Sequence, residues 1–480
     1  MTVCVGLDVG TTGARAIAIT LEGDVVARAE RPYRLSTPRP GWAEQDPEDW
    51  WHATEAALEE VASGHDVAGI GLSGQMHGLV CLDASDELIR PAILWNDQRT
   101  AAECAEIEDR VGLERLIALT GNRALTGFTA PKLLWLRRHE PEAYTRIARI
   151  MLPKDYVRLR LTHEWATDVT DASGTLLLDV GRRAWSDDVV DALDVPASWL
   201  PPLLESPDAT GACNSLLRGT LVAAGAGDQP AAALGVGIDR PGRLSIVLGT
   251  SGVVLAALPE YAHDPEARVH AFCHAVPGAW QAMGVMLSAA GSLQWFRDTL
   301  APDMSFDGLV AEADAWEPGA EGLLFAPYLA GERTPHADPD ARGAFVGLAL
   351  RHDRGALVRA VLEGVAFGLR DTLELMSALG VDTSVARVSG GGASSRSWLR
   401  VVASVLDIPL EVTEAGEGSA FGAALLGGVA GGMFADVHEA VERTVRVREV
   451  VEPDASWQAA YDELYPRYRA LYPATKGVLR

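Results

Sequence analysis

Two short turns, about half a chain apart, have the residue types of phosphate-binding hairpins. The first is Asp8–Gly13 (DVGTTG) and the second is Leu248–Gly252 (LGTSG), and each lies between two apolar, strand-like runs. Glycine lets the backbone come close to an anion, and consecutive amide N–H groups and a hydroxyl then face the phosphate oxygens. Two such hairpins on two related domains predict a site that holds the phosphates of a nucleotide between them.

Five residues of these turns are the expected phosphate contacts. One GTSG turn alone would be weak evidence, because many hairpins contain glycine and threonine for their turn geometry. The repetition strengthens the interpretation, since both copies lie between strand-like runs and one begins with an aspartate. The residues that we expect to bind the phosphates are Thr11, Thr12, Gly249, Thr250 and Ser251.

Two charged residues accompany the first turn. Asp8 ends an otherwise apolar strand, where a carboxylate can cap the turn or hold Mg²⁺. We favour the Mg²⁺ interpretation, with the ion bound through water, because Mg²⁺ keeps part of its hydration shell. Arg15 lies just past the turn and can either neutralise phosphate charge or be an ordinary exposed cation. The sequence leaves both interpretations of Arg15 open.

A third charged residue lies at the end of another expected strand. Asp228 follows the apolar run Leu221–Ala226 and begins a helix of small residues, with Gln229 beside it. Its carboxylate can cap that helix, or it can accept a proton from a substrate hydroxyl. Phosphoryl transfer needs such a group to orient and deprotonate the attacking alcohol. Spacing alone does not decide between the helix cap and the general base.

The loop Gly74–Gly78 (GQMHG) follows a strand and contains Met76 and His77. A lone histidine more often has a structural role, but the flanking glycines and the position at a strand end favour a contact with a polyol. His270 and His274 have no third ligand at a spacing typical of a metal site. We therefore expect no transition-metal centre.

Two further glycine-rich segments precede expected helices. Gly390–Gly392 lies between a strand and a helix, where it can admit a nucleoside or simply form a turn. Gly416–Gly428 is more typical of tight helix packing, although such a helix can also form a flat wall for adenine. Trp42 and Trp295 are weaker candidates for the site, and we favour a packing role for both.

The composition is that of an acidic globular protein with more than one domain. The chain has 480 residues, a net charge of −25 and five scattered cysteines without a CxxC pair. The length favours two or three domains, and the negative charge argues against nucleic-acid binding. No apolar run reaches the ~18–20 residues that span a bilayer, and no signal peptide precedes the first strand. We expect a cytoplasmic protein with reduced cysteines and with neither nucleic-acid nor membrane partners.

The surrounding elements form two α/β halves, each beginning with a β-hairpin. We expect domains at 1–240 and 241–480, with ligands in the cleft between them. Asp46 and Pro47 have the residue types of an N-cap and a first helical position, whereas Leu152–Tyr156 (LPKDY) is expected to be a loop. The other expected strands are Val3–Asp8, Arg15–Thr20, Val25–Glu30, Ile70–Ser73, Val80–Leu82, Leu221–Ala226 and Val385–Ser389, and the other expected helices are Ala101–Arg110, Ala130–Arg138, Ser288–Leu300, Arg354–Leu379, Ser397–Leu406 and Trp457–Tyr472.

Together these segments resemble the FGGY family of carbohydrate kinases over essentially the whole chain. Gly127–Leu136 (GFTAPKLLWL) is similar to the family's first signature, and Gly343–Leu348 (GAFVGL), continuing to Arg359–Glu363, is similar to the second. The resemblance implies a two-domain α/β fold of the actin-like, ribonuclease-H-like ATPase superfamily. It also implies ATP and Mg²⁺ in an interdomain cleft, and a homodimer.

The segments on the substrate side resemble those of bacterial family members that phosphorylate D-xylulose on its terminal 5-hydroxyl. Glycerol kinases and ribulokinases share the phosphate turns but are not similar in these segments. The segments in question are Trp42–Pro47, Ser73–Gly78, Trp95–Arg99, Leu152–Tyr156 and Gly331–His336.

The resemblance also implies roles for individual residues. Asp228 matches the family's catalytic base, and Asp8 matches the phosphate-loop aspartate needed for activity. Met76 and His77 match the pair that contacts the sugar. The positions that match the adenosine region are Gly391, Gly392 and Ser395.

Three functions remain open at this point. The leading one is a D-xylulose kinase, in which Gln229 stands where relatives often have asparagine. Because either amide can bind a sugar hydroxyl, a second hypothesis is that the protein is a kinase of another pentulose or pentitol, such as D-ribulose or D-arabinitol. The third is an actin-like nucleotide switch, which has the least support because a switch needs no pocket of the Met76, His77 and Asp228 type.

Overall fold

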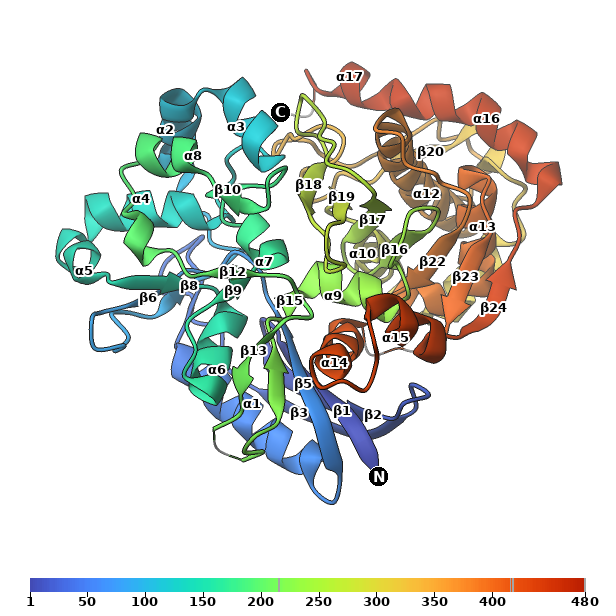
Figure 1. Ribbon diagram of the computed structural model, residues 1–480. Helices are drawn as coiled ribbons and strands as arrows, with labels where there is room; N and C mark the ends of the chain where they lie inside the picture. The colour runs from blue at the N-terminus through green and yellow to red at the C-terminus, as the bar shows by residue number, and fades with distance from the viewer. Residues whose placement is uncertain (215, 415, 417, 479–480) are drawn as a thin grey trace.

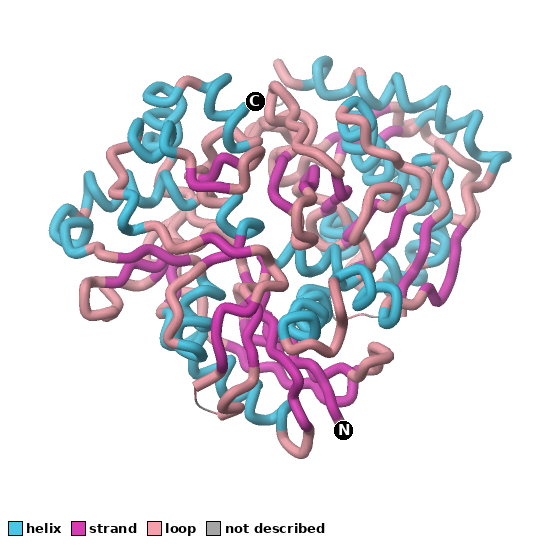
Figure 2. Tube along the Cα trace, in the orientation of Figure 1, coloured by secondary structure: helices cyan, strands magenta, loops and turns pink. Residues whose placement is uncertain are grey.

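The computed structural model describes residues 1–214, 216–414, 416 and 418–478. The expected ranges 1–240, 241–480 and 416–428 therefore each include positions outside the described residues. Two mixed sheets form the centres of the two halves, and a helical layer lies beside the first (Figure 1). The cyan and magenta segments of Figure 2 show the alternation of helices and strands along most of the chain.

The first sheet is built around a central parallel pair. Its strand order is β13-β14-β5-β1-β2-β3, and β15 also pairs with β5. The first two strands form the expected hairpin, and the first strand pairs in parallel with β5 on its other side. The strands are β1 (Thr2–Val9), β2 (Gly13–Ile19), β3 (Val25–Pro32), β5 (Asp66–Gly74), β13 (Ala209–Ala212), β14 (Leu221–Ala223) and β15 (Ala226–Gly227).

The second sheet repeats this topology. Its strand order is β18-β19-β17-β16-β22-β23-β24, in which an antiparallel hairpin again pairs in parallel with a later strand. The strands are β16 (Leu244–Leu248), β17 (Gly252–Leu258), β18 (His270–Cys273), β19 (Trp280–Met286), β22 (Ala386–Ser389), β23 (Leu410–Thr413) and β24 (Val447–Val451). The two phosphate-type turns thus occupy equivalent places in two related sheets.

A helical layer is inserted into the first half between β5 and β13. It lies beside both sheets, at the left of Figure 1, and packs its apolar side chains against β17, β18 and β19 of the second sheet. Its helices are α2 (Ala101–Val111), α3 (Leu113–Thr120), α4 (Thr129–His139), α5 (Pro141–Arg146), α6 (Pro153–Thr162), α7 (Val169–Ser173), α8 (Asp187–Ala192) and the 3₁₀ turn Ala197–Trp199. Short strand pairs link these helices: β4 (Glu44–Gln45) with β7 (Ala92–Ile93), β6 (Val80–Leu82) with β8 (Arg149–Met151), β9 (Thr167–Asp168) with β12 (Leu203–Leu204), and β10 (Leu178–Asp179) with β11 (Ala184–Trp185).

The remaining helices cover the two sheets. In the first half these are α1 (Pro47–Ala62) and α9 (Asp228–Gly235). In the second half they are α10 (Ala290–Leu300), α11 (Phe306–Ala313), α12 (Arg354–Ala378), α13 (Arg396–Leu406), α14 (Gly418–Ala430), α15 (Val437–Thr444), α16 (Ala455–Arg469) and α17 (Leu471–Thr475), with the 3₁₀ turns Ala320–Gly322 and Gly391–Ser394 and the pair β20 (Leu324–Ala326) and β21 (Ala344–Val346).

Helix α14 belongs to the second half of the chain but packs on the sheet of the first half. It lies directly on β1 and β5 and against α9. A Cβ atom on Gly71 would lie 1.8 Å from the carbonyl oxygen of Ala423, and one on Gly422 would lie 1.8 Å from that of Ala231. Backbone therefore meets backbone at this contact, and only glycine fits at these positions.

Most expected elements are confirmed, including the hairpins and the start of α1. Asp46 accepts a hydrogen bond from the amide of Glu48, and Pro47 begins the helix. The expectation of a loop at Leu152–Tyr156 is wrong, because Pro153 is the first residue of α6. Proline is well suited to that position, and the polar residues after it are buried in ion pairs rather than exposed in a loop.

The expected strand Leu221–Ala226 is divided into two. Gly225 has a φ of +84°, which breaks the extended conformation between β14 and β15. The five cysteines are all buried and free. Among the described residues, no helix combines the length and the apolar character that crossing a membrane requires.

The glycine contact of α14 gives the first prediction. Gly71→Ala should lower the melting temperature strongly, by the equivalent of about 3 kcal/mol or more, because the new methyl overlaps the backbone of α14. Gly308→Ala is the control, because it lies in α11 with only flexible side-chain ends nearby and should be neutral or slightly stabilising. Thermal unfolding followed by circular dichroism measures both. Equal melting temperatures for Gly71→Ala and the unchanged protein would show that α14 can move away without cost.

Candidate active site

The carboxyl ends of three parallel strands meet at one edge of the first sheet. On β5, Ser73 pairs with Asp8 of β1 on one side and with Ala226 of β15 on the other. The next pair along β5 and β15 is Gly74 with Gly227, immediately before Asp228. Ligands of open α/β sheets bind beyond such strand ends. The topology therefore brings Asp8, Asp228 and the loop after β5 to one place.

Asp8 is held at the end of β1 by hydroxyl groups. Ser73 donates a hydrogen bond to its carboxylate over 2.7 Å, and Ser419 of α14 donates another. Burial raises the pKa of Asp8, and these hydrogen bonds together with the charge of Arg15 act in the opposite direction. The second half of the chain thus contributes directly to the surroundings of this carboxylate.

Asp228 is the first residue of α9 rather than its N-cap. The cap position is taken by Gly227, so the carboxylate is not used to close the helix. Burial and the negative charge of Asp8 raise the pKa of Asp228 to about 7, and the Gln229 side chain donates a weak hydrogen bond over 3.4 Å. A carboxylate with a pKa near neutrality is suited to general-base catalysis.

Met76 lies against the residue that precedes the base. A Cβ atom on Gly227 would come within 2.7 Å of the Met76 side chain, so glycine is required there. His77, the next residue, has a φ of +69°, which is unusual for a residue with a side chain. Met76 is therefore packed against the residue before Asp228, and His77 follows it in the same loop.

The hydrogen bonds of His77 define its proton-bearing nitrogen. Nδ1 lies 2.8 Å from the carbonyl oxygen of Gly174, and since a carbonyl can only accept, Nδ1 carries the proton. Burial lowers the pKa of His77 to about 3, and the nearby charges of Lys132 and Arg333 add to this effect. The ring is therefore neutral, and Nε2 is left as a hydrogen-bond acceptor.

Several residues that shape this site were not singled out from the sequence. The carbonyl of His77 accepts hydrogen bonds from the hydroxyl of Thr129, over 3.0 Å, and from the buried amino group of Lys132, over 3.1 Å. Thr129 and Lys132 belong to the first family signature, which was the available signal for them. Arg333, in the segment Gly331–His336, brings a positive charge near His77 from the second half of the chain.

The first hairpin turns its carbonyl groups into the protein. Gln75 and Tyr33 bind the carbonyl of Gly10, and Gln45 binds that of Thr11 over 2.7 Å. Within the part of the chain that the structure describes, the amide N–H groups of Thr11 and Thr12 form no hydrogen bond. This orientation leaves amides for an anion, as expected of a phosphate turn.

The second hairpin has the same arrangement. The carbonyl oxygens of Gly249 and Thr250 accept hydrogen bonds from the first amides of α10 and the residue before it, over 2.8 and 2.9 Å. The Ser251 hydroxyl makes a long hydrogen bond, 3.4 Å, to the carbonyl of Leu287. The equivalent place in two related sheets therefore has equivalent backbone polarity.

A cavity of about 450 Å³ adjoins the second hairpin. It is lined on one side by Gly249, Thr250, Gly391, Gly392 and Ser395, and on the other by α10 and α11. A Cβ atom on Gly391 would meet no atom within 4 Å, so this glycine borders open space. The structure thus brings together the residues expected near the adenosine with two of those expected near the phosphates. The volume of the cavity is in the range of ligand pockets.

Three weaker candidates have other contacts. The guanidinium of Arg15 is paired with Glu30 of β3 at 3.6 Å and is 41% exposed. Trp42 is half-buried under the guanidinium of Arg99, 3.6 Å from its ring, and Trp295 packs beside Phe325. These contacts fit packing roles for the two tryptophans.

The site combines two anion-type turns, a nucleoside-sized cavity and two carboxylates at neighbouring strand ends, in a duplicated α/β fold. These are the features of kinases that phosphorylate small hydroxylated molecules. The N-terminal domain of the FGGY family of carbohydrate kinases matches residues 3–235, and the C-terminal domain of that family matches residues 244–431. The chain belongs to the FGGY family of carbohydrate kinases.

Individual relatives cover nearly the full chain. The xylulose kinase of Escherichia coli (strain K12) is 42% identical over 478 residues, which is 98% of both chains. That of Bacillus subtilis (strain 168) is 39% identical over 486 residues, covering 99% of this chain and 97% of the relative. The crystal structure of a xylulose kinase from Brucella ovis, 41% identical, superposes with a TM-score of 0.94 over 99% of this chain and 100% of the other. The expected two-domain, actin-like, ribonuclease-H-like ATPase fold is confirmed.

The raised pKa of Asp228 predicts a pH-dependent cost in stability. Folding binds a proton more tightly at this carboxyl, so its contribution to the free energy of unfolding falls as pH rises from about 4 to about 7 and then stays low. Asp228→Asn should therefore melt several degrees above the unchanged protein at pH 8, and the gap should close toward pH 4. Melting temperatures of the ligand-free protein across this range measure the effect.

Asp454→Asn is the matched control for that series. Hydrogen bonds from Ser456 and Arg400 lower the pKa of Asp454 to about 2, so loss of its charge should lower the melting temperature at pH 8. A gap for Asp228→Asn that is absent at pH 8, or that widens toward pH 4, would contradict the raised pKa.

Proposed function

We propose that the protein transfers the γ-phosphoryl group of ATP to O5 of D-xylulose, giving D-xylulose 5-phosphate and ADP, and is thus a xylulokinase. The observation that carries the proposal is the position of Asp228, a half-buried carboxylate with a pKa near neutrality, at the end of the central strands and next to Gly227, against which Met76 packs. The family membership and the xylulose kinases among its similar relatives support the same reaction.

In the proposed mechanism the sugar binds beside Met76 and His77. The neutral His77 ring accepts a hydrogen bond from a sugar hydroxyl at Nε2, because its Nδ1 proton is used by Gly174. Asp228 orients the terminal hydroxyl and takes its proton as the oxygen attacks the γ-phosphorus in line. The Gln229 amide, next to the base, binds a further hydroxyl.

ATP is proposed to lie along the two hairpins. The amides and hydroxyls of Thr11 and Thr12 bind phosphate oxygens from one side, and those of Gly249–Ser251 bind from the other. The cavity lined by Gly391, Gly392 and Ser395 takes the adenosine. The charge of Arg15 acts to lower the pKa of Asp8, and we propose that Arg15 also adds positive potential at the phosphates. Closure of the two halves excludes water.

The residues at the first hairpin fit a bound Mg²⁺. Asp8 offers hard carboxylate oxygens, and its negative charge together with that of Asp228 raises the cost of leaving both ionised without a cation. Asp8 would hold the ion through water. Bound Mg²⁺ would neutralise the charge of the phosphate oxygens during transfer.

The cellular compartment and the partners of the protein are proposed on other grounds. Five buried free thiols fit a reducing compartment such as the cytoplasm. The net charge of −25 fits small-molecule substrates rather than nucleic acid or an anionic membrane surface as partners. A homodimer is proposed from the family resemblance alone.

Sugar-dependent release of ADP tests the reaction. With MgATP we expect turnover with D-xylulose and little with D-ribulose, L-ribulose, glycerol, D-arabinitol or no sugar. Asp228→Ala should lower kcat about 10²- to 10⁴-fold while ATP still binds, because only the proton acceptor is lost. Coupled detection of ADP gives the rates, and isothermal calorimetry with an ATP analogue gives the affinity.

Each other outcome of that assay has a distinct meaning. Turnover with D-ribulose or D-arabinitol would contradict the substrate but keep the base, and the amide of Gln229 makes this the principal alternative. ADP release that no sugar changes would support a nucleotide switch. An active Asp228→Ala variant would overturn the assignment of the base.

The nucleotide cavity has its own test. Gly391→Val should raise the KM for ATP about tenfold or more, because the side chain enters open space in the cavity, and should leave the KM for the sugar and the melting temperature unchanged. Gly477→Val is the control, since a Cβ atom there also meets nothing within 4 Å but lies outside the cavity. Steady-state kinetics measure both KM values. An unchanged KM for ATP in Gly391→Val would place the adenosine elsewhere.

A further inference from the structure

The short helix α7 touches both groups that the proposed reaction uses. At its start, the hydroxyl of Thr170 accepts a hydrogen bond over 3.0 Å from the amide of Gly227, the residue before Asp228. At its end, the carbonyl of Gly174 accepts the Nδ1 proton of His77 over 2.8 Å. Helix α7 thus contacts both β15, which ends immediately before Asp228, and the ring of His77, which is proposed to face the sugar.

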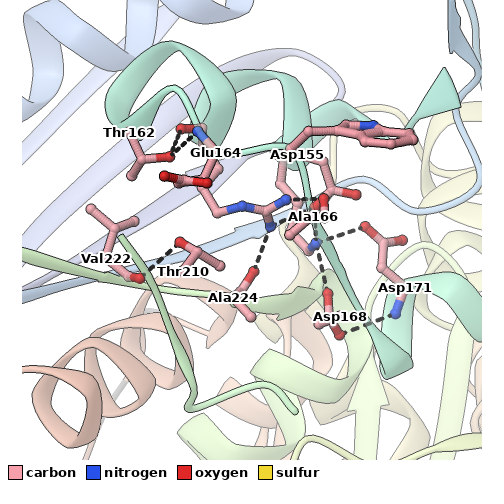
Figure 3. A network of polar contacts seen from close by, with 12 residues as sticks. Asp155, Thr162, Glu164, Ala166, Asp168, Asp171, Thr210, Val222 and Ala224 are labelled. Carbon is pink, nitrogen blue, oxygen red and sulfur yellow. Dashed lines mark hydrogen bonds and ion pairs between the residues drawn. The ribbon is translucent and has the colours of Figure 1, made fainter. Parts of the chain in front are cut away.

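The start of α7 is fixed by a buried cluster of charged side chains. Lys154 lies 2.6 Å from a carboxylate oxygen of Asp155, 2.6 Å from one of Asp168 and 3.4 Å from one of Asp171, and Arg158 lies 2.8 Å from Asp155. All five side chains are fully buried. Figure 3 shows Asp155, Asp168 and Asp171 close together in this cluster.

The charges of this cluster balance without a metal ion. Burial raises the pKa of Asp171 well above its ordinary value, and the neighbouring negative charges of Asp155 and Asp168 raise it further. With a proton on Asp171, the remaining two carboxylates face the two cations Lys154 and Arg158. The amino group of Lys154 already fills the point where the carboxylates converge, so the cluster acts as a support rather than as a cation site.

The hydroxyl of Thr170 is oriented by this support. It donates its single proton to Asp168, whose same carboxylate oxygen also caps α7 by accepting from the amides of Thr170 and Asp171. The hydroxyl lone pairs are then free to accept the amide proton of Gly227. An ion pair from Lys154 to Asp168, and hydrogen bonds from Asp168 through Thr170, therefore connect the cluster to the backbone next to the base.

The backbone at this point needs an external restraint. Gly227 must be glycine, because a Cβ atom would collide with Met76, and glycine restricts its own backbone least of all residues. Its amide is held by the Thr170 hydroxyl. The restraint that a side chain would give at residue 227 is thus supplied from α7.

We propose that Thr170 is a positioning residue for Asp228: through its hydrogen bond to the amide of Gly227 it sets where the base stands relative to the sugar held at His77. The inference rests on the proposed function, because it assigns Thr170 a part in the proton transfer to Asp228. Its action is on the geometry of the reacting groups rather than on the binding of ATP, since among the described residues the Thr170 hydroxyl bonds only to Asp168 and to the amide of Gly227.

The test compares two substitutions at one position. Thr170→Val keeps the shape of the side chain but removes the acceptor, and should lower kcat about 10- to 100-fold with the KM for ATP unchanged. Thr170→Ser keeps the hydroxyl and should retain most of kcat. Thr175→Val is the control, because the hydrogen bonds that the structure describes for the buried Thr175 hydroxyl join it to Ala172 and Leu177, near its own place in the chain. Steady-state kinetics of each full-length variant, with melting temperatures, give the comparison.

Each result of this comparison supports or overturns the proposed role of Thr170. Thr170→Val at wild-type kcat overturns the proposal, as does a folded Thr170→Ser as impaired as Thr170→Val. If Thr170→Val does not fold, Thr170→Ala replaces it, since that change also removes the acceptor, and wild-type kcat in Thr170→Ala overturns the proposal equally. A wild-type enzyme active on another sugar contradicts the proposed substrate alone, and the variants are then compared with that sugar. A wild-type protein without sugar-dependent turnover overturns both proposals.

Discussion

The contact of α14 with the first sheet constrains the rest of the structure. A Cβ atom on Gly6 or Gly69 would lie 2.0 Å from a carbonyl oxygen of this helix, so the backbones meet with no side chain between them. Helix α14 is part of the second half of the chain, and its Ser419 donates a hydrogen bond to Asp8. Because the contact is backbone on backbone, it cannot loosen gradually, and the end of β1 that carries Asp8 is fixed relative to α14.

The duplicated sheets place similar backbone polarity at two points. In each sheet an antiparallel hairpin is followed by a parallel strand, β5 in the first and β22 in the second, and each of these ends in a glycine-rich loop. The carbonyls of both turns are bound by the protein, which leaves amides outward. The loops after the parallel strands then differ: one carries Met76 and His77, and the other borders the cavity at Gly391. The two sheets thus have anion-type turns in equivalent places, and the loops that follow the parallel strands differ in the residues they carry.

The sequence predicted the elements whose signals are local. Hairpin strands alternate with glycine-rich turns, and Asp46 with Pro47 marks a helix start, so both could be recognised. The segment Leu152–Tyr156 was misassigned because its charged residues suggested exposure, whereas Lys154 and Asp155 are buried as an ion pair with partners that follow in the chain. The approach of Asp8 to Asp228 and the bond from Thr170 to Gly227 depend on which strands become neighbours. No local pattern contains that information, so these parts of the site required the structure.

Two groups of carboxylates in this protein differ in how their negative charges are balanced. Around Lys154 the positive and negative charges balance, and Asp168 caps α7, although Oδ2 of Asp155 and Oδ1 of Asp171 lack a hydrogen-bond partner within the described part of the chain. At the strand ends the surroundings of Asp228 favour its protonated form, because burial and then the negative charge of Asp8 raise its pKa to about 7. A base is most effective when its pKa lies near the working pH, so burial that weakens the fold at this carboxyl suits the proposed role of Asp228. The backbone next to Asp228 is held by α7, and the start of α7 is capped by Asp168 of the balanced cluster.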